Sequence, residues 1–582
     1  MLVAPSNVSF AMSTEESNSF DYFRKYTLHQ LPGSSRVLSW DLLTLPTSQC
    51  EPAVAHATIA LASMHRALDT PRSNREGYTA AFFDSTQHHL AVRQYTRALK
   101  CLQDFMRQET AVSNSGMEVI ILLSLLFFCF EIFQGEDATA QAHFRTGTRL
   151  LLDRLNREKS TGYPKNGRQI VLRSRPLEKV ELLAQTFVRL DSDLALVRET
   201  GFMLRPICPQ PLPKCFVSVD EALVHLDALQ FEGTDIMSSI QEFTRSQLNA
   251  AHDLQGFEES MVAALVHVKF RLMSLESVPQ LQKRMETFGR KLEAWNAAYA
   301  SLRWKAEDEL VHLLASIHSF FLWLEIIYWR SSSEMDFDRI YHELEHTLSL
   351  AERYVELEQS LTEQVSGSGS NNRRVPTLGT NVPVIVYTIA EKCRSSRVRR
   401  RCTQLLRSMN LQGVSDQHYV ASLLEHTVAL EERQAKAITG KHAKFDLVPE
   451  DFPKEARFWI AEICADFGSG VDWNNFYKQH TARVFLGRYS DVDDEIVITE
   501  AQFSIMRLGS NSDPKHDARF LLPELCGLDT SCVGVRHRFS NSKDSSTCLK
   551  GPLRKERDTA PDFLSRLHPW TSWSRLAQDP YD

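Results

Sequence analysis

The sequence predicts an all-α protein of stacked antiparallel helix pairs, with minor short strands near the C-terminus. The first observation is residues 117–133, which are apolar on every side except at Glu118, Ser124 and Glu131. Such a segment is typical of a helix buried in the middle of a helical protein. The second is an apolar stripe at helical spacing over residues 140–155. It consists of Ala140, Phe144, Gly147, Leu151 and Leu155.

A short acidic break over residues 134–137 separates these two segments. Because so short a connection leaves consecutive helices as antiparallel neighbours, we expect a helical hairpin of the kind found in tetratricopeptide-like stacks. A membrane-spanning helix would need about 20 apolar residues. The run over residues 117–133 is shorter and carries a Glu near each end, so we expect a core helix and no association with a membrane.

Helical patterns continue on both sides of this hairpin. We expect helices over residues 20–31, 51–68, 88–106, 176–197, 219–229, 236–275, 281–302, 307–329, 337–358 and 384–435. Proline removes a backbone donor and fixes φ, so the cluster Pro206, Pro209, Pro211 and Pro213 predicts irregular structure. Short strands are expected at residues 456–461 and 482–485, and residues 496–503 alternate weakly.

Changes in composition predict three parts of the chain. Residues 1–19 are small and polar and are expected to be disordered. Residues 20–505 would form the helical domain, with an internal linker near residues 364–383 that contains the sequence SGSGSNN. Residues 506–582 have no apolar period and are expected to be irregular or disordered, or else an artefact of the gene model; neither interpretation assigns the tail a function.

The overall charge and the cysteines exclude several classes of protein. A net charge of −7 argues against a protein that coats nucleic acid or lies on an anionic membrane. The 11 cysteines are scattered, no two are separated by only two residues, and the start has no secretory leader. We therefore expect a reduced intracellular compartment, in which most cysteines act as small buried hydrophobes.

No motif supports an enzyme. The sequence lacks G-x-S-x-G, G-x-G-x-x-G and Walker-type patterns. His342 and His346 formally match the zinc-protease pattern H-E-x-x-H, but the helical stripe through Leu344 and Leu348 places both histidines on the opposite, solvated face. We therefore expect no catalytic, cofactor-binding or metal-binding residues and no enzymatic activity. A tightly bound divalent metal with turnover would revive the enzyme hypothesis.

Basic residues concentrate between residues 380 and 410, where Glu391 is the one acid that opposes them. Such an excess can contact phosphate groups or act as a nuclear import signal. The alternative is a solvated helical face whose Arg stems cover apolar surface, and Val398, Cys402 and Leu405 favour it because they indicate an integrated helix. The candidate residues are Lys392, Arg394, Arg397, Arg399, Arg400 and Arg401.

Several stretches match one family in order and spacing. They are EPAVAHA and ALASMH at residues 51–57 and 60–65, AVRQY and AL at 91–95 and 98–99, FEIFQG and AHFRTG at 130–135 and 142–147, FVRLD at 187–191, and AEKCR and RVRRR at 390–394 and 397–401. Together, over roughly residues 20–503, they resemble the fungal-specific transcription-factor regulatory domain that follows zinc binuclear-cluster modules.

The resemblance implies a nuclear transcription regulator whose helical domain modulates the activity of a metabolic or secondary-metabolite gene set. The zinc cluster of that family needs six cysteines with two C-x2-C pairs, and this chain contains no C-x2-C. We therefore expect no zinc or other cofactor, no direct sequence-specific DNA binding, and a partner that is another transcription regulator or a second copy of the chain. A gene model that lacks an upstream zinc-cluster exon would also explain the missing cysteines. The alternative is a helical-repeat interaction or ligand-sensing protein with no direct role in transcription.

Overall fold

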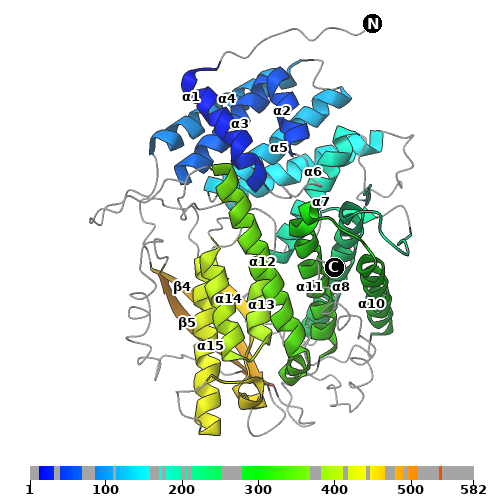
Figure 1. Cartoon of the computed structure of the whole chain (residues 1–582), viewed down its shortest axis with the longest axis vertical. Coiled ribbons are helices and arrows are strands. Elements are labelled where there is room, and N and C mark those ends of the chain that lie inside the picture. The colour runs from blue at the N-terminus through cyan, green and yellow to red at the C-terminus, as the bar shows by residue number, and fades with distance from the viewer. Residues whose placement is uncertain are drawn as a thin grey trace.

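The computed structural model arranges its helices in two groups, one stacked on the other (Figure 1). The prediction of an all-α fold is confirmed, since helices make up most of the described chain and strands are few. The structure describes residues 12–31, 40–68, 85–108, 113–134, 136–157, 169–173, 178–197, 203–207, 211–250, 278–331, 333–366, 382–409, 417–440, 446–465, 479–489, 496–506 and 537–539, together with Val262 and Val266.

The upper group of Figure 1 surrounds the central apolar helix α5. Every residue of α5 from Ile121 to Phe133 is buried. A helix that is apolar on all sides must be covered on all sides, and α2, α3, α6 and α7 pack against it. The elements of this group are α1 (Thr14–Lys25), η1 (Thr27–Gln30), α2 (Trp40–Cys50), α3 (Pro52–Leu68), α4 (Ser85–Met106), α5 (Asn114–Gln134), α6 (Asp137–Arg157), β1 (Gln169–Val171), α7 (Lys179–Val197) and β2 (Arg205–Ile207).

The predicted antiparallel hairpin is formed by α5 and α6. Its register is fixed by an ion pair of 2.9 Å between Arg154 and Glu118 at one end and by the contact of His143 with Glu131 at the other. Between them, Gly147 lies so close to α5 that an added Cβ would stand 2.0 Å from Ser124 Oγ and 2.6 Å from Phe187 Cζ of α7. Glycine therefore lets three helices meet at one point.

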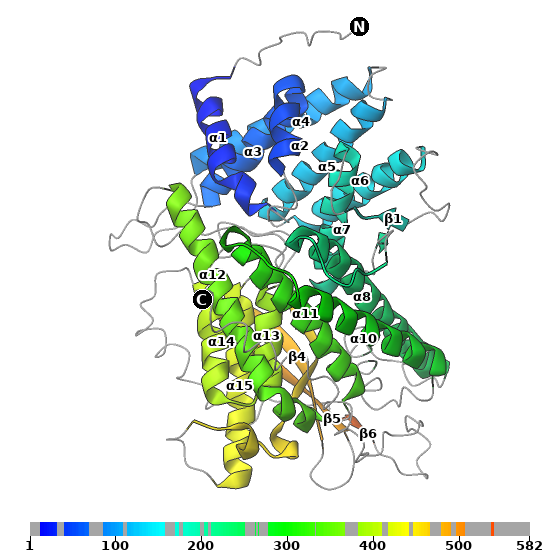
Figure 2. The same cartoon turned by 45° about the vertical axis from the view of Figure 1, so that its right-hand side comes forward.

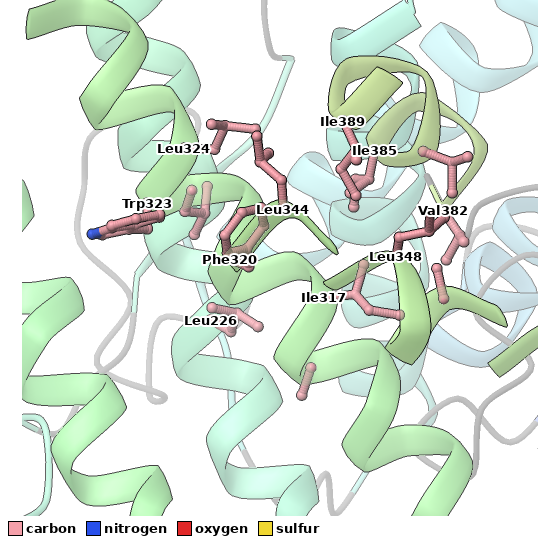
Figure 3. Close-up of a cluster of buried hydrophobic side chains, with 14 of the residues drawn as sticks. Leu226, Ile317, Phe320, Trp323, Leu324, Leu344, Leu348, Val382, Ile385 and Ile389 are labelled. Atoms are coloured by element: carbon pink, nitrogen blue, oxygen red, sulfur yellow. The ribbon is translucent and has the colours of Figure 1, made fainter. Parts of the chain in front are cut away.

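The lower group shares a second hydrophobic core, part of which is drawn in Figure 3. There, α8, α11, α12 and α13 contribute Leu226, Phe320, Leu344 and Ile385. The elements are α8 (Val219–Ala250), α10 (Pro279–Ala300), η4 (Ala306–Asp308), α11 (Glu309–Arg330), η5 (Glu334–Ile340), α12 (Tyr341–Ser366), α13 (Val382–Lys392), α14 (Ser396–Ser408), α15 (Gln417–Thr439), η6 (Pro449–Asp451) and η7 (Lys454–Ala456).

Helix α8 joins the two groups. Its Val224 belongs to the upper core, while its Leu223 and Leu226 belong to the lower core. The prediction of a break between residues 229 and 236 was wrong, because α8 runs without interruption through Gly233. An added Cβ at that glycine would stand 3.0 Å from Phe288 Cζ of α10, so the glycine serves helix packing here and not a turn.

A four-stranded antiparallel sheet lies beside α15 and has the order β3 (Trp459–Ala465), β4 (Gln479–Tyr489), β5 (Ile496–Met506) and β6 (His537–Phe539). Its orange strands are visible behind α13 and α15 in Figure 2. The strand predicted at residues 456–461 began too early, because β3 starts at Trp459 after the short helix η7. The strands predicted at residues 482–485 and 496–503 were too short, since β4 and β5 pair over their whole lengths. The indole of Trp459 lies against Gly487, where an added Cβ would stand 2.4 Å from Cε2.

Three other expectations were wrong in part. The prediction of disorder through residue 19 was wrong from Thr14 onward, because Ser13 and Glu16 form a capping box at the start of α1. The prediction of irregular structure at Pro206 was wrong, because this residue lies in β2, which pairs in parallel with β1 and places Pro206 opposite Ile170. Both strands of a two-stranded sheet are edge strands, and an edge strand tolerates proline. The tail was expected to lack structure, yet it contributes β6. The remaining residues of both termini and most of the linker near residues 364–383 lie outside the described residues.

Two helices, Asn114–Gln134 and Ala306–Arg330, are long and apolar enough to cross a membrane by length and composition. Most of each is buried inside the fold, which is the usual condition of a core helix. That the chain does not associate with a membrane stays a prediction.

We predict that Phe144→Asp destabilises the upper group strongly. Phe144 is 2% exposed, and its ring lies 5.5 Å from that of Phe128 and 5.3 Å from that of Phe187. The substitution buries an unpaired charge, at a cost of about 3–5 kcal/mol. Arg145→Asp, at an exposed neighbouring position, is the matched control. Equal thermal unfolding of the two variants would show that Phe144 is not part of the core.

A buried carboxyl group in the lower group predicts a pH effect on stability. Glu325 Oε2 on α11 is buried without a hydrogen-bond partner among the described residues, and burial raises the pKa of this carboxyl from 4.5 to about 8. The folded chain then holds a proton that the unfolded chain releases. The contribution of Glu325 is therefore complete below about pH 4.5 and is lost as the pH rises to about 8.

Glu325→Gln should remove this dependence. The melting temperature of the variant should match that of the native chain at pH 4.5 and exceed it increasingly toward pH 8, because the amide needs no proton to remain neutral. Thermal unfolding of both proteins across this range measures the difference. A difference that does not change with pH would contradict the burial of this carboxyl.

Candidate functional site

The six candidate basic residues lie at the end of α13 and on α14, where the fold divides them into two sets. Lys392, Arg394 and Arg399 are buried, with exposed fractions of 3%, 0% and 1%. Arg397 and Arg400 are exposed and Arg401 is half-buried. The division follows the helix period, because Arg399 lies on the same side of α14 as the buried Cys402 and Leu406.

The buried set pairs with carboxylates from distant parts of the chain. Arg394 Nη1 donates to Glu334 Oε2 of η5 over 3.0 Å, and Arg394 Nη2 donates to Glu431 Oε1 of α15 over 3.0 Å. Arg399 Nη2 donates to Glu431 Oε2. Lys392 Nζ lies 3.4 Å from Glu334 Oε1 and 3.2 Å from Glu391 Oε1. We call these six residues, three cations and three carboxylates, the Glu431 cluster.

Glu431 and Arg394 stay ionised because nearby opposite charges outweigh the effect of burial on their pKa values. Burial alone would raise the pKa of the Glu431 carboxyl, but Arg394 and Arg399 outweigh it and hold that pKa below its ordinary value of 4.5. Burial likewise lowers the pKa of Arg394, and Glu431 and Glu334 more than offset this, so the pKa is raised. The cations also face aromatic rings, with Lys392 Nζ 4.7 Å from the centre of Tyr328.

The same cluster fixes the start of the sheet. Arg394 Nη2 donates to the carbonyl of Phe458 over 2.7 Å, and the Phe458 N–H donates to Glu431 Oε1 over 2.6 Å. Next to it, Arg457 forms a two-pronged ion pair of 2.8 and 2.6 Å with Asp338. Planar guanidinium groups suit such bidentate contacts. The cluster therefore joins η5, α13, α14 and α15 to the residue that precedes β3.

The outer set is neutralised at the surface. Arg397 Nη2 lies 2.5 Å from Glu345 Oε1, and Arg401 Nη2 lies 2.6 Å from Glu352 Oε2, both on α12. Arg400 Nη2 lies 2.5 Å from Asp446 Oδ1. A basic surface was therefore the wrong prediction for the buried set, and so was the alternative of a solvated face. A role in nuclear import for Arg397, Arg400 and Arg401 stays a prediction.

No pattern in the sequence marks the carboxylates Glu334 and Glu431 of the cluster. Glu334 precedes Arg394 by 60 positions and Glu431 follows Arg399 by 32. Neither belongs to a recognisable motif, and ion pairs over such separations depend on the folded arrangement. The missed residues of this site are Glu334, Glu431, Asp338 and Arg457.

The histidine pair on α12 does not form a recognisable metal site. His342 is exposed and His346 is half-buried, and burial lowers the pKa of His346. Within the part of the chain that the structure describes, no group of three or more His, Cys, Asp or Glu residues is placed to hold a metal ion.

Most of the stretches that carry the family resemblance lie where helices of the upper group meet, whereas AEKCR and RVRRR lie at the end of α13 and on α14 of the lower group. Tyr95 on α4 stacks on Phe130, with ring centres 4.3 Å apart, and its hydroxyl donates to Glu131 of α5. The same hydroxyl lies 3.2 Å from His143 Nε2 of α6. Burial raises the pKa of Glu131 and lowers that of His143, so both groups tend toward their neutral forms.

A second polar contact ties α1, α3 and α4 together. Gln94 Oε1 lies 2.6 Å from His56 Nδ1, and Gln94 Nε2 donates to Glu16 Oε1 over 2.6 Å. Arg97 Nη1 pairs with the same carboxylate over 2.8 Å. In the FVRLD stretch, Asp191 accepts hydrogen bonds from the backbone N–H groups of residues 203 and 204. These motif residues therefore hold helices together, and their contacts are structural in kind.

We predict that Arg394→Met destabilises the lower group by about 3–5 kcal/mol, because Glu334 and Glu431 would each lose a buried partner. Arg400→Met is the matched control, since its ion pair with Asp446 is exposed and such pairs contribute about 0–1 kcal/mol. Denaturant unfolding of both variants measures the two costs. Similar small losses would show that the cluster is not essential for stability.

Comparison with known proteins agrees with the motif stretches between residues 51 and 191, and the match does not extend to those at residues 390–401. The family of the fungal specific transcription factor domain matches residues 19–295, from α1 into α10. No curated protein and no solved structure matched the chain. The matched segment contains the hairpin, the FVRLD stretch and the first two helices of the lower core. Through residues 19–295, the chain therefore belongs to the fungal specific transcription factor domain family.

Proposed function

We propose that this chain is a nuclear regulator of transcription that controls a metabolic or secondary-metabolite gene set through its helical domain, without enzymatic activity. The observation that carries the proposal is the family match over residues 19–295. The contacts of Tyr95, Glu131 and His143 support it, because the family's motif residues stand where helices of the upper group meet.

The regulatory unit that we propose extends beyond the family match. Trp295, at the end of that match, is fully buried and its indole N–H donates to the carbonyl of Ala222 on α8 over 2.9 Å. The core around it also contains Phe320 of α11, Leu344 of α12 and Ile385 of α13, all beyond residue 295. Because one core rarely folds in halves, we treat residues 20–505 as the functional unit.

In this proposal the DNA reader is not supplied by the residues described above. A zinc binuclear cluster would need two C-x2-C pairs, and no two cysteines in the sequence have that spacing. Among the described cysteines, Cys129, Cys393 and Cys402 are buried in the helical cores. The chain would reach DNA through a partner, either another transcription regulator or a second copy that acts with one.

We predict that the purified chain binds duplex DNA weakly and without sequence preference. Its net charge is −7, the cations of its basic run are paired with carboxylates, and non-specific binding alone gives dissociation constants of about 10⁻⁴ to 10⁻⁶ M at physiological salt. Fluorescence anisotropy with a library of labelled duplexes would test this. A nanomolar, sequence-selective complex at physiological salt would overturn the proposed dependence on a partner.

The regulatory function itself is tested by tethering. The full chain is fused to a heterologous DNA-binding module in a fungal cell whose reporter carries the sites of that module. We expect reporter output to change several-fold, and the same change to be lost with Phe144→Asp but retained with Arg145→Asp. If a nuclear, well-expressed fusion leaves the reporter unchanged, and deletion of the gene leaves transcript levels unchanged, the chain is instead a helical interaction or ligand-sensing protein.

A further inference from the structure

The basic segment over residues 392–401 is enclosed by parts of the chain that are far from it in sequence. Two of the three carboxylates of the Glu431 cluster come from outside the segment, Glu334 from η5 and Glu431 from α15. The exposed fractions of the Arg394 and Arg399 side chains are 0% and 2%. Access to these two cations therefore depends on whether α15 and η5 remain in place.

Glu431 holds several elements at once. Its Oε1 accepts hydrogen bonds from Arg394 and from the N–H of Phe458, and its Oε2 accepts one from Arg399. Loss of this one carboxylate would remove the ion-pair partner of Arg399, would leave Arg394 paired with Glu334, and would break one of the two hydrogen bonds that hold Phe458, the residue before β3. The attachment of α15 to α14 and the attachment of the sheet to α13 are thus coupled through a single side chain.

Helix α15 and the sheet also share small cores of their own. Leu423 of α15 packs with Phe458, Val484 and Leu486 of the segment that leads into β3 and of β4. A second small cluster joins Ala435 of α15 to Leu447, Phe452 and Ala456. Tyr387 and Val420 pack against both the first of these clusters and the lower core, to which α15 also contributes Ala421 and Leu424. The helix and the sheet are therefore held to each other, and opening them together would also break the contacts of Ala421 and Leu424 with the lower core.

Helices α13 and α14 are anchored independently of α15. Arg397 and Arg401 of α14 pair with Glu345 and Glu352 of α12. On the buried side of α14, Val398 and Leu406 belong to the lower core. If α15 and the sheet move away, the segment over residues 392–401 therefore stays folded against α12.

The contact between α15 and the basic segment is polar, and some of its buried hydrogen-bond donors have no acceptor among the described residues. Arg394 Nε and Arg399 Nη1 are buried and have no hydrogen-bond partner within the described structure. A buried ion-pair network is often no more stable than apolar side chains of the same volume, and it loses much of its stability when one member is removed. An interface of this kind forms in one defined arrangement and separates cooperatively. An apolar interface of the same size would be at least as stable.

We propose that the Glu431 cluster is a latch: α15 and the sheet close over the basic segment of residues 392–401, and opening of the latch exposes Arg394 and Arg399. In the closed state these two cations are inaccessible from the solvent. In the open state they join Arg397, Arg400 and Arg401 in a continuous basic segment. This inference goes beyond the proposed role in transcription and does not depend on it, because it follows from the contacts of the folded chain.

Trypsin tests the latch directly, because it cleaves after accessible Lys and Arg residues. The full chain is digested briefly under native conditions as the unaltered protein, as Glu431→Gln and as Glu425→Gln, with cleavage sites identified by mass spectrometry. Glu425 lies on the same helix and pairs with Arg407 at the surface, so its variant is the matched control. Proteolysis of an opened segment follows the population of the open form.

We expect Glu431→Gln to speed cleavage after Arg394, which lies in the non-helical connection between α13 and α14, at least about tenfold. Cleavage in α5 should not become faster, and Glu425→Gln should digest like the unaltered chain. Unchanged cleavage in Glu431→Gln, or equal acceleration in both variants, would overturn the proposal.

A second measurement guards against general unfolding of Glu431→Gln. In native-state hydrogen exchange of the unaltered chain, the amides of α15 and β3 should exchange together, through an opening that leaves α5 protected. Exchange of α15 and β3 only at the rate of α5, through global unfolding, would overturn the latch whatever the variant does.

Discussion

The constraint on which the fold depends is the need to cover α5 on every side. A helix with no polar face cannot lie at the surface of a soluble domain, so α2, α3, α6 and α7 are drawn around it. The closest approach is at Gly147, where the backbone of α6 lies against Ser124 of α5 and Phe187 of α7. A side chain at that position would push three helices apart. The family's motif residues cluster around this hairpin for the same reason.

In the upper group apolar contacts hold elements together, whereas buried charged residues do so in the lower group. There, hydrogen-bonded ion pairs around Glu431 lie beside two small apolar clusters at the junction between helices and sheet. A guanidinium group donates its hydrogen bonds in its own plane. The bonds that Arg394 donates to Glu431 and to the Phe458 carbonyl therefore fix where α15 and Phe458 must lie. The arrangement of the helices and the sheet at this junction is therefore determined more by the directions of these hydrogen bonds than by their contribution to stability. The basic run suggests a surface patch in the sequence, but in the fold its residues Lys392, Arg394 and Arg399 form buried ion pairs that join the helices to the sheet.

How much could be predicted from the sequence differs between these two regions. The hairpin was predictable, because the uninterrupted apolar run of α5 and the stripe through Phe144 and Gly147 are local patterns with helical period. The burial of Lys392, Arg394 and Arg399 was not, because it depends on Glu334 and Glu431, which lie far away in sequence. The strand at Pro206 was missed for a similar reason, since its partner β1 sits in a polar stretch. Local periodicity predicts elements, while pairing at long range requires the fold.

The central claim is that the close contact of α5, α6 and α7 at Gly147 holds the upper group together. It is tested most directly by the unfolding free energy of Gly147→Ala beside that of Gly289→Ala. At Gly289 of α10 an added Cβ would meet only Ile326 Cδ1, at an ordinary 3.9 Å, so we expect no loss, or a gain of about 0.5–1 kcal/mol. At Gly147 we expect a loss of about 1–3 kcal/mol. If both variants are equally stable, the three helices do not depend on this contact and the account is wrong.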